Sequence, residues 1–121
     1  MAVQSYRDLH VWQASMDLVE TVYRLTQALP QKEVYALCNQ MQRATVSIPS
    51  NIAEGHARDS TKEYLHHLSI ALGSLAELET QVIVAKRLAY IQQSDADATL
   101  NKATDVGRML RGLQKSLKAK L

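Results

Sequence analysis

Apolar residues recur at every third or fourth position along most of the chain, which is the spacing of one face of a helix. Within residues 8–29 two such lines run side by side, so the apolar sector is broader than one bundle seam needs. We predict a helix over this range, ended by Pro30, whose second line either packs deeply or forms a self-association surface. The first line consists of Val11, Ala14, Leu18, Val22, Leu25 and Leu29, and the second of Trp12, Met16, Val19 and Tyr23.

The next helix is predicted over residues 33–55 and contains a proline. Its apolar line keeps the same phase on both sides of Pro49, although an interior proline costs about 3 kcal/mol and one backbone hydrogen bond. We therefore expect Pro49 to bend this helix without ending it. Gly55 is suited to stop the helix, because glycine commonly follows a helix end. The apolar line consists of Met41, Ala44, Ile48 and Ile52.

A second line on the same helix also keeps helical spacing and is entirely polar. It consists of Arg43, Ser47, Asn51 and Glu54. We predict that Arg43, Asn51 and Glu54 bond to one another, to a neighbouring helix or to a neighbouring subunit, which would fix the packing register. The alternative is a patch that faces a ligand, although a line of mixed charge is not a phosphate site.

Two further helices follow. Ser60 and Glu63 have the spacing of a capping box, in which each side chain satisfies a free amide of the other residue. A third helix should start there and run to about residue 88, and Ser94 should cap a fourth. The inward positions are Tyr64, Leu68, Ala71, Leu75, Leu78, Val82 and Ala85 on the third helix, and Ala103, Val106, Leu110, Leu113 and Leu117 on the fourth.

The short links between these helices make consecutive helices antiparallel neighbours. The predicted fold class is all-α, an antiparallel up-down-up-down four-helix bundle in which residues 1–121 form a single domain. In the third helix the small residues Ala71, Gly73 and Ser74 should permit close approach of another helix. The composition agrees, since the chain has no phenylalanine, four glycines and two prolines.

The single cysteine, Cys38, lies among apolar residues and should be buried without a disulfide partner. The first residues form no hydrophobic signal region, and no apolar run approaches the length needed to span a membrane. We therefore expect a cytoplasmic protein with no membrane partner.

Catalytic and metal-binding signatures are sparse. Glu63 and His66 have the spacing that places two ligands on one helix face in di-iron bundles, but no second such pair occurs among the other histidines. A surface contact between these two residues is the simpler interpretation. The chain also lacks a nucleophile elbow and a glycine-rich phosphate loop. We predict no enzymatic activity, no metal and no cofactor.

Positive charge gathers in the last helix. The net charge is only +2, but residues 89–121 carry six basic residues against three acidic ones. Four of the bases recur on the side opposite the apolar line and form a candidate nucleic-acid surface: Arg108, Arg111, Lys115 and Lys118. The alternative is a solvated helix face whose lysines suit the end of the helix.

Several motifs together resemble a known family. They are Leu9-x-Val11-Trp12, Pro30-x-x-Glu33-x-Tyr35-x-Leu37-x-x-Gln40, Arg43-Ala44-x-x-Ser47-Ile48-x-x-Asn51-Ile52-Ala53-Glu54-Gly55-x-x-Arg58, and Ala71-x-Gly73-Ser74-x-x-Glu77-Leu78. The chain resembles the bacterial four-helix bundle proteins encoded in intervening sequences of large-subunit ribosomal RNA genes. The resemblance gives Arg43, Ser47, Asn51, Glu54, Gly55 and Arg58 as family-motif residues with structural roles.

The resemblance also implies a cytoplasmic homopentamer of antiparallel four-helix subunits. A similar protein is the basic, pentameric accessory protein of diversity-generating retroelements, which binds nucleic acid and a reverse transcriptase; the present chain departs from it in being nearly balanced in charge outside the last helix. We therefore predict a non-enzymatic oligomeric accessory module that binds RNA, DNA or a ribonucleoprotein through the four bases of the last helix. The alternative is a multivalent protein–protein scaffold without nucleic-acid binding. Trp12 and Tyr23 are the candidate contacts between subunits.

Overall fold

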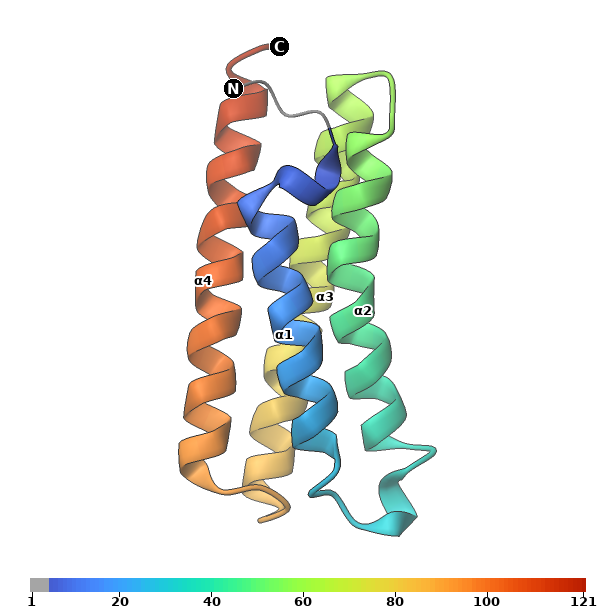
Figure 1. Ribbon diagram of the computed structural model, residues 1–121, viewed down its shortest axis with the longest axis vertical. Coiled ribbons are helices and arrows are strands. Elements are labelled where there is room, and N and C mark those ends of the chain that lie inside the picture. Colours follow the sequence, from blue (N-terminus) through green and yellow to red (C-terminus); the bar gives the residue numbers. More distant parts are fainter. Residues whose placement is uncertain (1–4) are drawn as a thin grey trace.

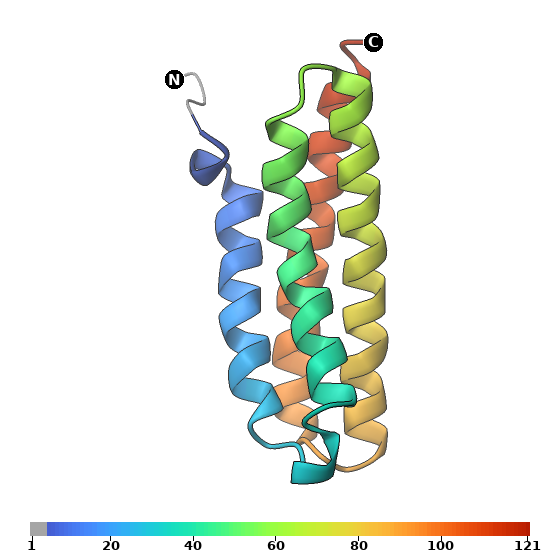
Figure 2. The same ribbon diagram turned by 90° about the vertical axis from the view of Figure 1, so that its right-hand side faces the viewer.

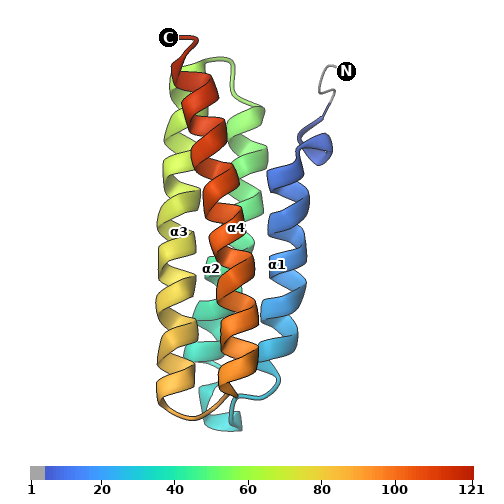
Figure 3. The same ribbon diagram turned by 90° about the vertical axis from the view of Figure 1, so that its left-hand side faces the viewer.

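The computed structural model describes residues 5–121, and these form four long helices with no strand (Figure 1). Successive helices run in opposite directions, and α1 also packs on α4, so each helix contacts two others (Figures 2 and 3). This confirms the predicted all-α antiparallel bundle. The helices are α1 (His10–Thr26), α2 (Leu37–His56), α3 (Thr61–Arg87) and α4 (Gln93–Lys118), with 3-10 turns η1 (Tyr6–Asp8) and η2 (Gln31–Glu33).

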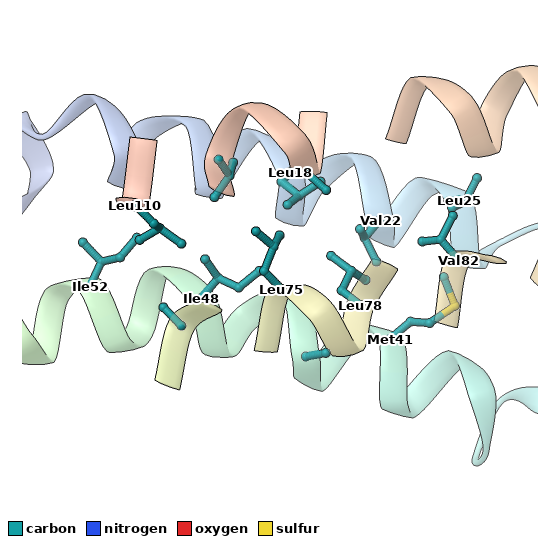
Figure 4. Packing of buried hydrophobic residues seen from close by; sticks show 14 of the residues in the cluster. Leu18, Val22, Leu25, Met41, Ile48, Ile52, Leu75, Leu78, Val82 and Leu110 are labelled. Carbon is teal, nitrogen blue, oxygen red and sulfur yellow. The ribbon is translucent and has the colours of Figure 1, made fainter. Parts of the chain in front are cut away.

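The core is built from the apolar lines of all four helices (Figure 4). Leu18, Ile48, Leu78 and Leu110, one from each helix, are fully shielded from solvent. Burial of each such side chain contributes roughly 1.5–3 kcal/mol relative to leaving it exposed. On α1 only the first apolar line is deeply packed, because the second line lies at the edge of the core or outside it.

Three predicted helix ends were wrong. Helix α1 ends at Thr26 and not at residue 29, because the chain closes in tight turns before Pro30, which is extended. Helix α2 begins at Leu37, since η2 occupies the positions where it was expected to start. Ser94 lies inside the first turn of α4, and the capping position belongs to the extended Gln92, whose side chain makes no capping bond.

Two predicted local features of α2 and α3 have clearer outcomes. Helix α2 continues through Pro49, as predicted, and the degree of bending stays a prediction. Ser60 does cap α3, and its Oγ accepts a hydrogen bond from the backbone N–H of Glu63 at 3.1 Å. The Glu63 carboxylate differs from the prediction, because it accepts from the Ser60 hydroxyl at 3.2 Å and not from the backbone amide.

Helix α3 is more apolar than we expected when we predicted that no apolar run could span a membrane. It has 27 residues and contains an 18-residue window of mean hydropathy 1.4, so by length and composition it is able to cross a membrane. The expectation that no run approaches that length was therefore wrong. A core helix of a soluble protein passes the same test, and the inward line from Leu68 to Ala85 packs in the bundle core.

One hydrogen bond ties two loops at the same end of the bundle. The Tyr90 hydroxyl, after α3, donates to Glu33 Oε2, before α2, at 2.8 Å. This bond is the main reason that the pKa of Tyr90 is raised above its ordinary value of about 10. Because the folded state favours the neutral phenol, the bond is fully present below the ordinary tyrosine pKa and is lost as pH rises through the raised value.

The end of α3 is a Schellman motif with an alanine where glycine is usual. Tyr90 N donates to the Ala85 carbonyl at 3.0 Å and Ala89 N donates to the Lys86 carbonyl at 2.9 Å. Ala89 has a φ of 62°, a left-handed conformation that costs residues other than glycine about 1–2 kcal/mol.

We expect Ala89→Gly to stabilise the protein by about 1 kcal/mol, because glycine adopts this conformation without the steric cost. Urea denaturation followed by circular dichroism measures the change. Ala98→Gly is the matched control, since Ala98 is an exposed residue inside α4, where glycine should destabilise by about 1 kcal/mol. A loss of stability in both variants would contradict the role assigned to Ala89.

Candidate functional site

A chain of hydrogen bonds joins α2 to α3 along the polar line of α2. Ser47 Oγ lies 2.8 Å from Ser74 Oγ on α3. Asn51 Nδ2 donates to the Ser47 carbonyl at 2.9 Å and to Ser47 Oγ at 3.0 Å, and Asn51 Oδ1 lies 3.1 Å from His67 Nδ1. Ser47 and Asn51 thus contact the neighbouring helix, which fixes how α2 and α3 align.

The network defines the tautomer of His67. Both contacts of Asn51 Nδ2 are with acceptors on Ser47, so Asn51 Oδ1 is left as an acceptor for His67. His67 Nδ1 therefore carries the proton and donates it. Glu54 Oε2 is 3.9 Å from the same nitrogen. This role of His67 was not predicted from the sequence, although its seven-residue spacing from Ser74 places both on one face of α3.

The charged family-motif residues Arg43, Glu54 and Arg58 lie outside this chain of hydrogen bonds. Glu54 pairs with Arg58 one turn away, with Arg58 Nη2 at 2.8 Å from Glu54 Oε1. Both side chains are about half exposed, so this pair contributes at most about 1 kcal/mol. Arg43 is exposed and makes no ion pair with any residue that the structure describes. The geometry therefore separates Arg43 from the rest of the polar line.

Gly55 has a different role from the predicted helix stop. Helix α2 continues to His56, and Gly55 is buried in the last turn without a positive φ. A Cβ at this position would lie 2.9 Å from His67 Cβ and 2.9 Å from Tyr64 Cδ1, distances that real structures essentially never show. Gly55 is thus a point of close approach between α2 and α3. Gly73, predicted to have that role, is exposed, and a Cβ added to it would meet nothing within 4 Å.

A polar hollow, the α2–α3 cleft, lies on the outer side of the same pair of helices and has a volume of about 430 Å³. Arg43 lines it from α2, and Glu77 and Gln81 line it from α3. Gln81 is buried, and its Oε1 has no hydrogen-bond partner within residues 5–121. The remaining lining residues are Tyr35, Ala36, Asn39, Gln40, Ala44, Ser47 and Ser74.

The four bases of the candidate nucleic-acid surface, here called the α4 stripe, are exposed on the outer face of α4, the helix at the front of Figure 3. They are Arg108, Arg111, Lys115 and Lys118. Arg108 Nη1 lies 3.0 Å from Asp105 Oδ1, and both side chains are mostly exposed. The other three make no ion pair within residues 5–121. Arg108 and Arg111 also line a groove of about 370 Å³ between α3 and α4, where Glu79 is the acidic lining residue.

The candidate subunit contacts lie over α1 and α2. Trp12 is half-buried beside Tyr6, with ring centroids 5.4 Å apart, and lines a mostly apolar hollow of about 280 Å³. Tyr23 is 42% exposed and lines a separate hollow that contains Arg43. The structure does not bring Trp12 and Tyr23 into one hollow, but Val46 of α2 lines both.

The groups considered for metal binding and nucleophilic chemistry remain dispersed. Within residues 5–121, no three His, Cys, Asp or Glu side chains gather at a potential metal site. Cys38 is buried, as predicted, and burial raises the pKa of its thiol. Its Sγ contacts the Thr26 carbonyl at 3.6 Å. A thiol held in its neutral form is a poor nucleophile.

Comparison with known proteins shows which family this architecture represents. The family described as 23S rRNA-intervening sequence protein matches residues 7–112. A solved structure from Bacteroides thetaiotaomicron, of a protein with unknown function from the S23 ribosomal protein family, superposes with a TM-score of 0.80. The similarity covers 87% of this chain and 95% of that chain at 24% identity, which shows the shared fold.

No curated protein matches the chain. The relation to the accessory protein of diversity-generating retroelements stays a prediction. The family match extends over nearly all of the bundle, from η1 into the second half of α4. The chain therefore belongs to the 23S rRNA-intervening sequence protein family.

Proposed function

We propose that the protein is a non-enzymatic, cytoplasmic, homo-oligomeric accessory module that binds the phosphate backbone of nucleic acid through the α4 stripe. The observation that carries this proposal is the charge of the outer face of α4. Residues 106–121 contain five basic residues and no acidic one. Arg111, Lys115 and Lys118 are exposed and unpaired within residues 5–121, so their charges are available to a polyanion.

Oligomerisation strengthens this proposal. In a homopentamer the stripe of four bases would recur five times, so one polyanion would meet about twenty positive side chains. The second apolar line of α1 lies at the edge of the core or outside it, which supports such an assembly. Met16 and Val46 are 38% and 40% exposed beside the half-buried Trp12 and Val19, and all four line the same hollow. A cluster of this kind is typical of a protein–protein contact.

Contacts with phosphate carry no base information, so we expect weak, sequence-tolerant binding. Four phosphate contacts predict a loss of affinity for duplex DNA of about a hundredfold between 50 and 200 mM salt. Fluorescence anisotropy with generic RNA and DNA measures this dependence. Changing all four residues of the α4 stripe to glutamine should abolish most of the binding at low salt.

The matched control removes four positive charges elsewhere. Arg24, Lys32, Lys62 and Arg87 are exposed and lie outside the stripe, and their replacement by glutamine should preserve most of the affinity. Equal binding by the wild type and the stripe variant, or no binding by the wild type at low salt, would refute the proposal. The protein would then be better described as a multivalent protein–protein scaffold.

A further inference from the structure

The α2–α3 cleft has no part in the binding proposed for α4, yet it has the size and polarity of a ligand site. Its volume of about 430 Å³ falls within the usual range for small-molecule pockets. We propose that it binds a nucleoside monophosphate, with a base that carries an exocyclic amino group inside the cleft and the phosphate at its mouth. The proposal rests on the cleft alone and is independent of the α4 stripe.

An unsatisfied acceptor on the α3 side favours an N–H donor as the ligand group. Gln81 is only 8% exposed, and its Oε1 has no hydrogen-bond partner within residues 5–121. Buried polar atoms are nearly always paired, so an exception at the wall of a cleft points to a missing partner. Gln81 lines the cleft, and a half-turn about its last torsion, which is broad, would exchange the buried oxygen with the amide nitrogen. Glu77, one turn away, provides a second acceptor.

The polar side chains that line the cleft are of the types that recognise a nucleobase. Asn39, Gln40 and Gln81 offer three carboxamides, which pair with adenine edges, while a carboxylate such as Glu77 accepts from the amino group of cytosine. Tyr35 is 93% exposed at one end of the cleft, where its ring is available for stacking on an unstacked base. Uracil has no exocyclic amino group and should therefore fit the two acceptors less well.

The α2 side favours an anion. Arg43 lines the cleft and has no ionic partner within residues 5–121. The first-turn amide of Leu37 already donates to Glu33 Oε1 at 3.4 Å, so Arg43 is the group that would hold the phosphate. From Ala36 to Ser47 the helix rises about 16 Å, which leaves room for a base, a ribose and a phosphate.

The test is an NMR titration of the full chain with AMP, CMP, GMP, UMP and adenosine. The amino-bearing nucleotides should shift the amide signals of the cleft residues. UMP and adenosine should bind at least about fivefold more weakly, since each lacks one contacting group. Gln81→Met removes the carboxamide at similar length and should weaken AMP binding about fivefold without unfolding the chain, because Oε1 has no partner to lose among residues 5–121.

One further variant tests the contact with the phosphate, and another is a control outside the cleft. Arg43→Gln should reduce the affinity for AMP to that for adenosine. Gln114→Met, at a half-buried position on α4 outside the cleft, is the matched control and should bind AMP as the wild type does. Equal AMP affinity in the wild type and Gln81→Met, equal affinity for AMP and UMP, or no shifts at about 10 mM AMP would overturn the proposal. The stripe variant should keep its AMP affinity, so either proposal can fail without the other.

Discussion

Gly55→Ala is expected to destabilise the protein by about 2–3 kcal/mol, which is the upper part of the range for an overpacked core site. The added methyl group would lie 2.9 Å from His67 Cβ and 3.2 Å from the Tyr64 carbonyl oxygen. These atoms belong to the backbone of α3 or are attached directly to it, so they cannot yield as the tip of a flexible side chain would. Relief therefore requires α2 and α3 to separate, and urea denaturation measures the cost.

Gly73→Ala and Gly112→Ala are the matched controls. Both glycines are exposed on helices, and nothing lies within 4 Å of a Cβ built at either position. Each change should stabilise the protein by about 0.5–1 kcal/mol, because alanine has the higher helix propensity. If Gly55→Ala were as stable as the wild type, the close approach of α2 and α3 at this point would not be what requires glycine.

The second large effect is expected on assembly. The wild type should behave as a homo-oligomer, and five copies of the 13.5 kDa chain correspond to about 68 kDa. Met16→Asp combined with Val46→Asp should lower the mass to that of a single chain, because each carboxylate would lose its hydration in the proposed contact. Both positions are partly exposed in the isolated chain, so its folding should be retained. Light scattering at micromolar concentration measures the mass.

Ile83→Asp combined with Met109→Asp is the control pair. These residues lie on α3 and α4 and are 41% and 40% exposed, so they match the test pair in apolar character and accessibility. This control should keep the mass of the wild type. A wild type of single-chain mass would refute self-association, and loss of assembly in both double variants would refute its placement over α1 and α2.

The sequence predicts the bundle well because the helical period is a local property. The line Met41, Ala44, Ile48 and Ile52 is buried as expected, and its constant phase correctly indicated that α2 continues through Pro49. The four-residue link between α2 and α3 likewise indicated antiparallel neighbours.

Features that depend on distances between helices were not predictable in the same way. Gly55 has the sequence signature of a helix stop, and only the position of Tyr64 and His67 shows that it is a contact point. The unpaired oxygen of Gln81 depends on which side chains of α2 lie opposite it. The start of α4 was also missed, because the helix begins after Gln92, whose side chain makes no capping bond, although the preferred capping residue Ser94 follows two positions later.

The order in which the four helices contact one another affects how the chain folds. Of the four helix–helix interfaces, those of α1 with α2, α2 with α3 and α3 with α4 join neighbours in the sequence, and α2–α3 is the most extensive. Their contact order is low, which is typical of domains that fold quickly. Among these four interfaces within residues 5–121, the docking of α1 on α4 is the one that joins distant parts of the chain. Because the entropy of loop closure grows only with the logarithm of loop length, that step adds little to the free-energy barrier once α2 and α3 have paired.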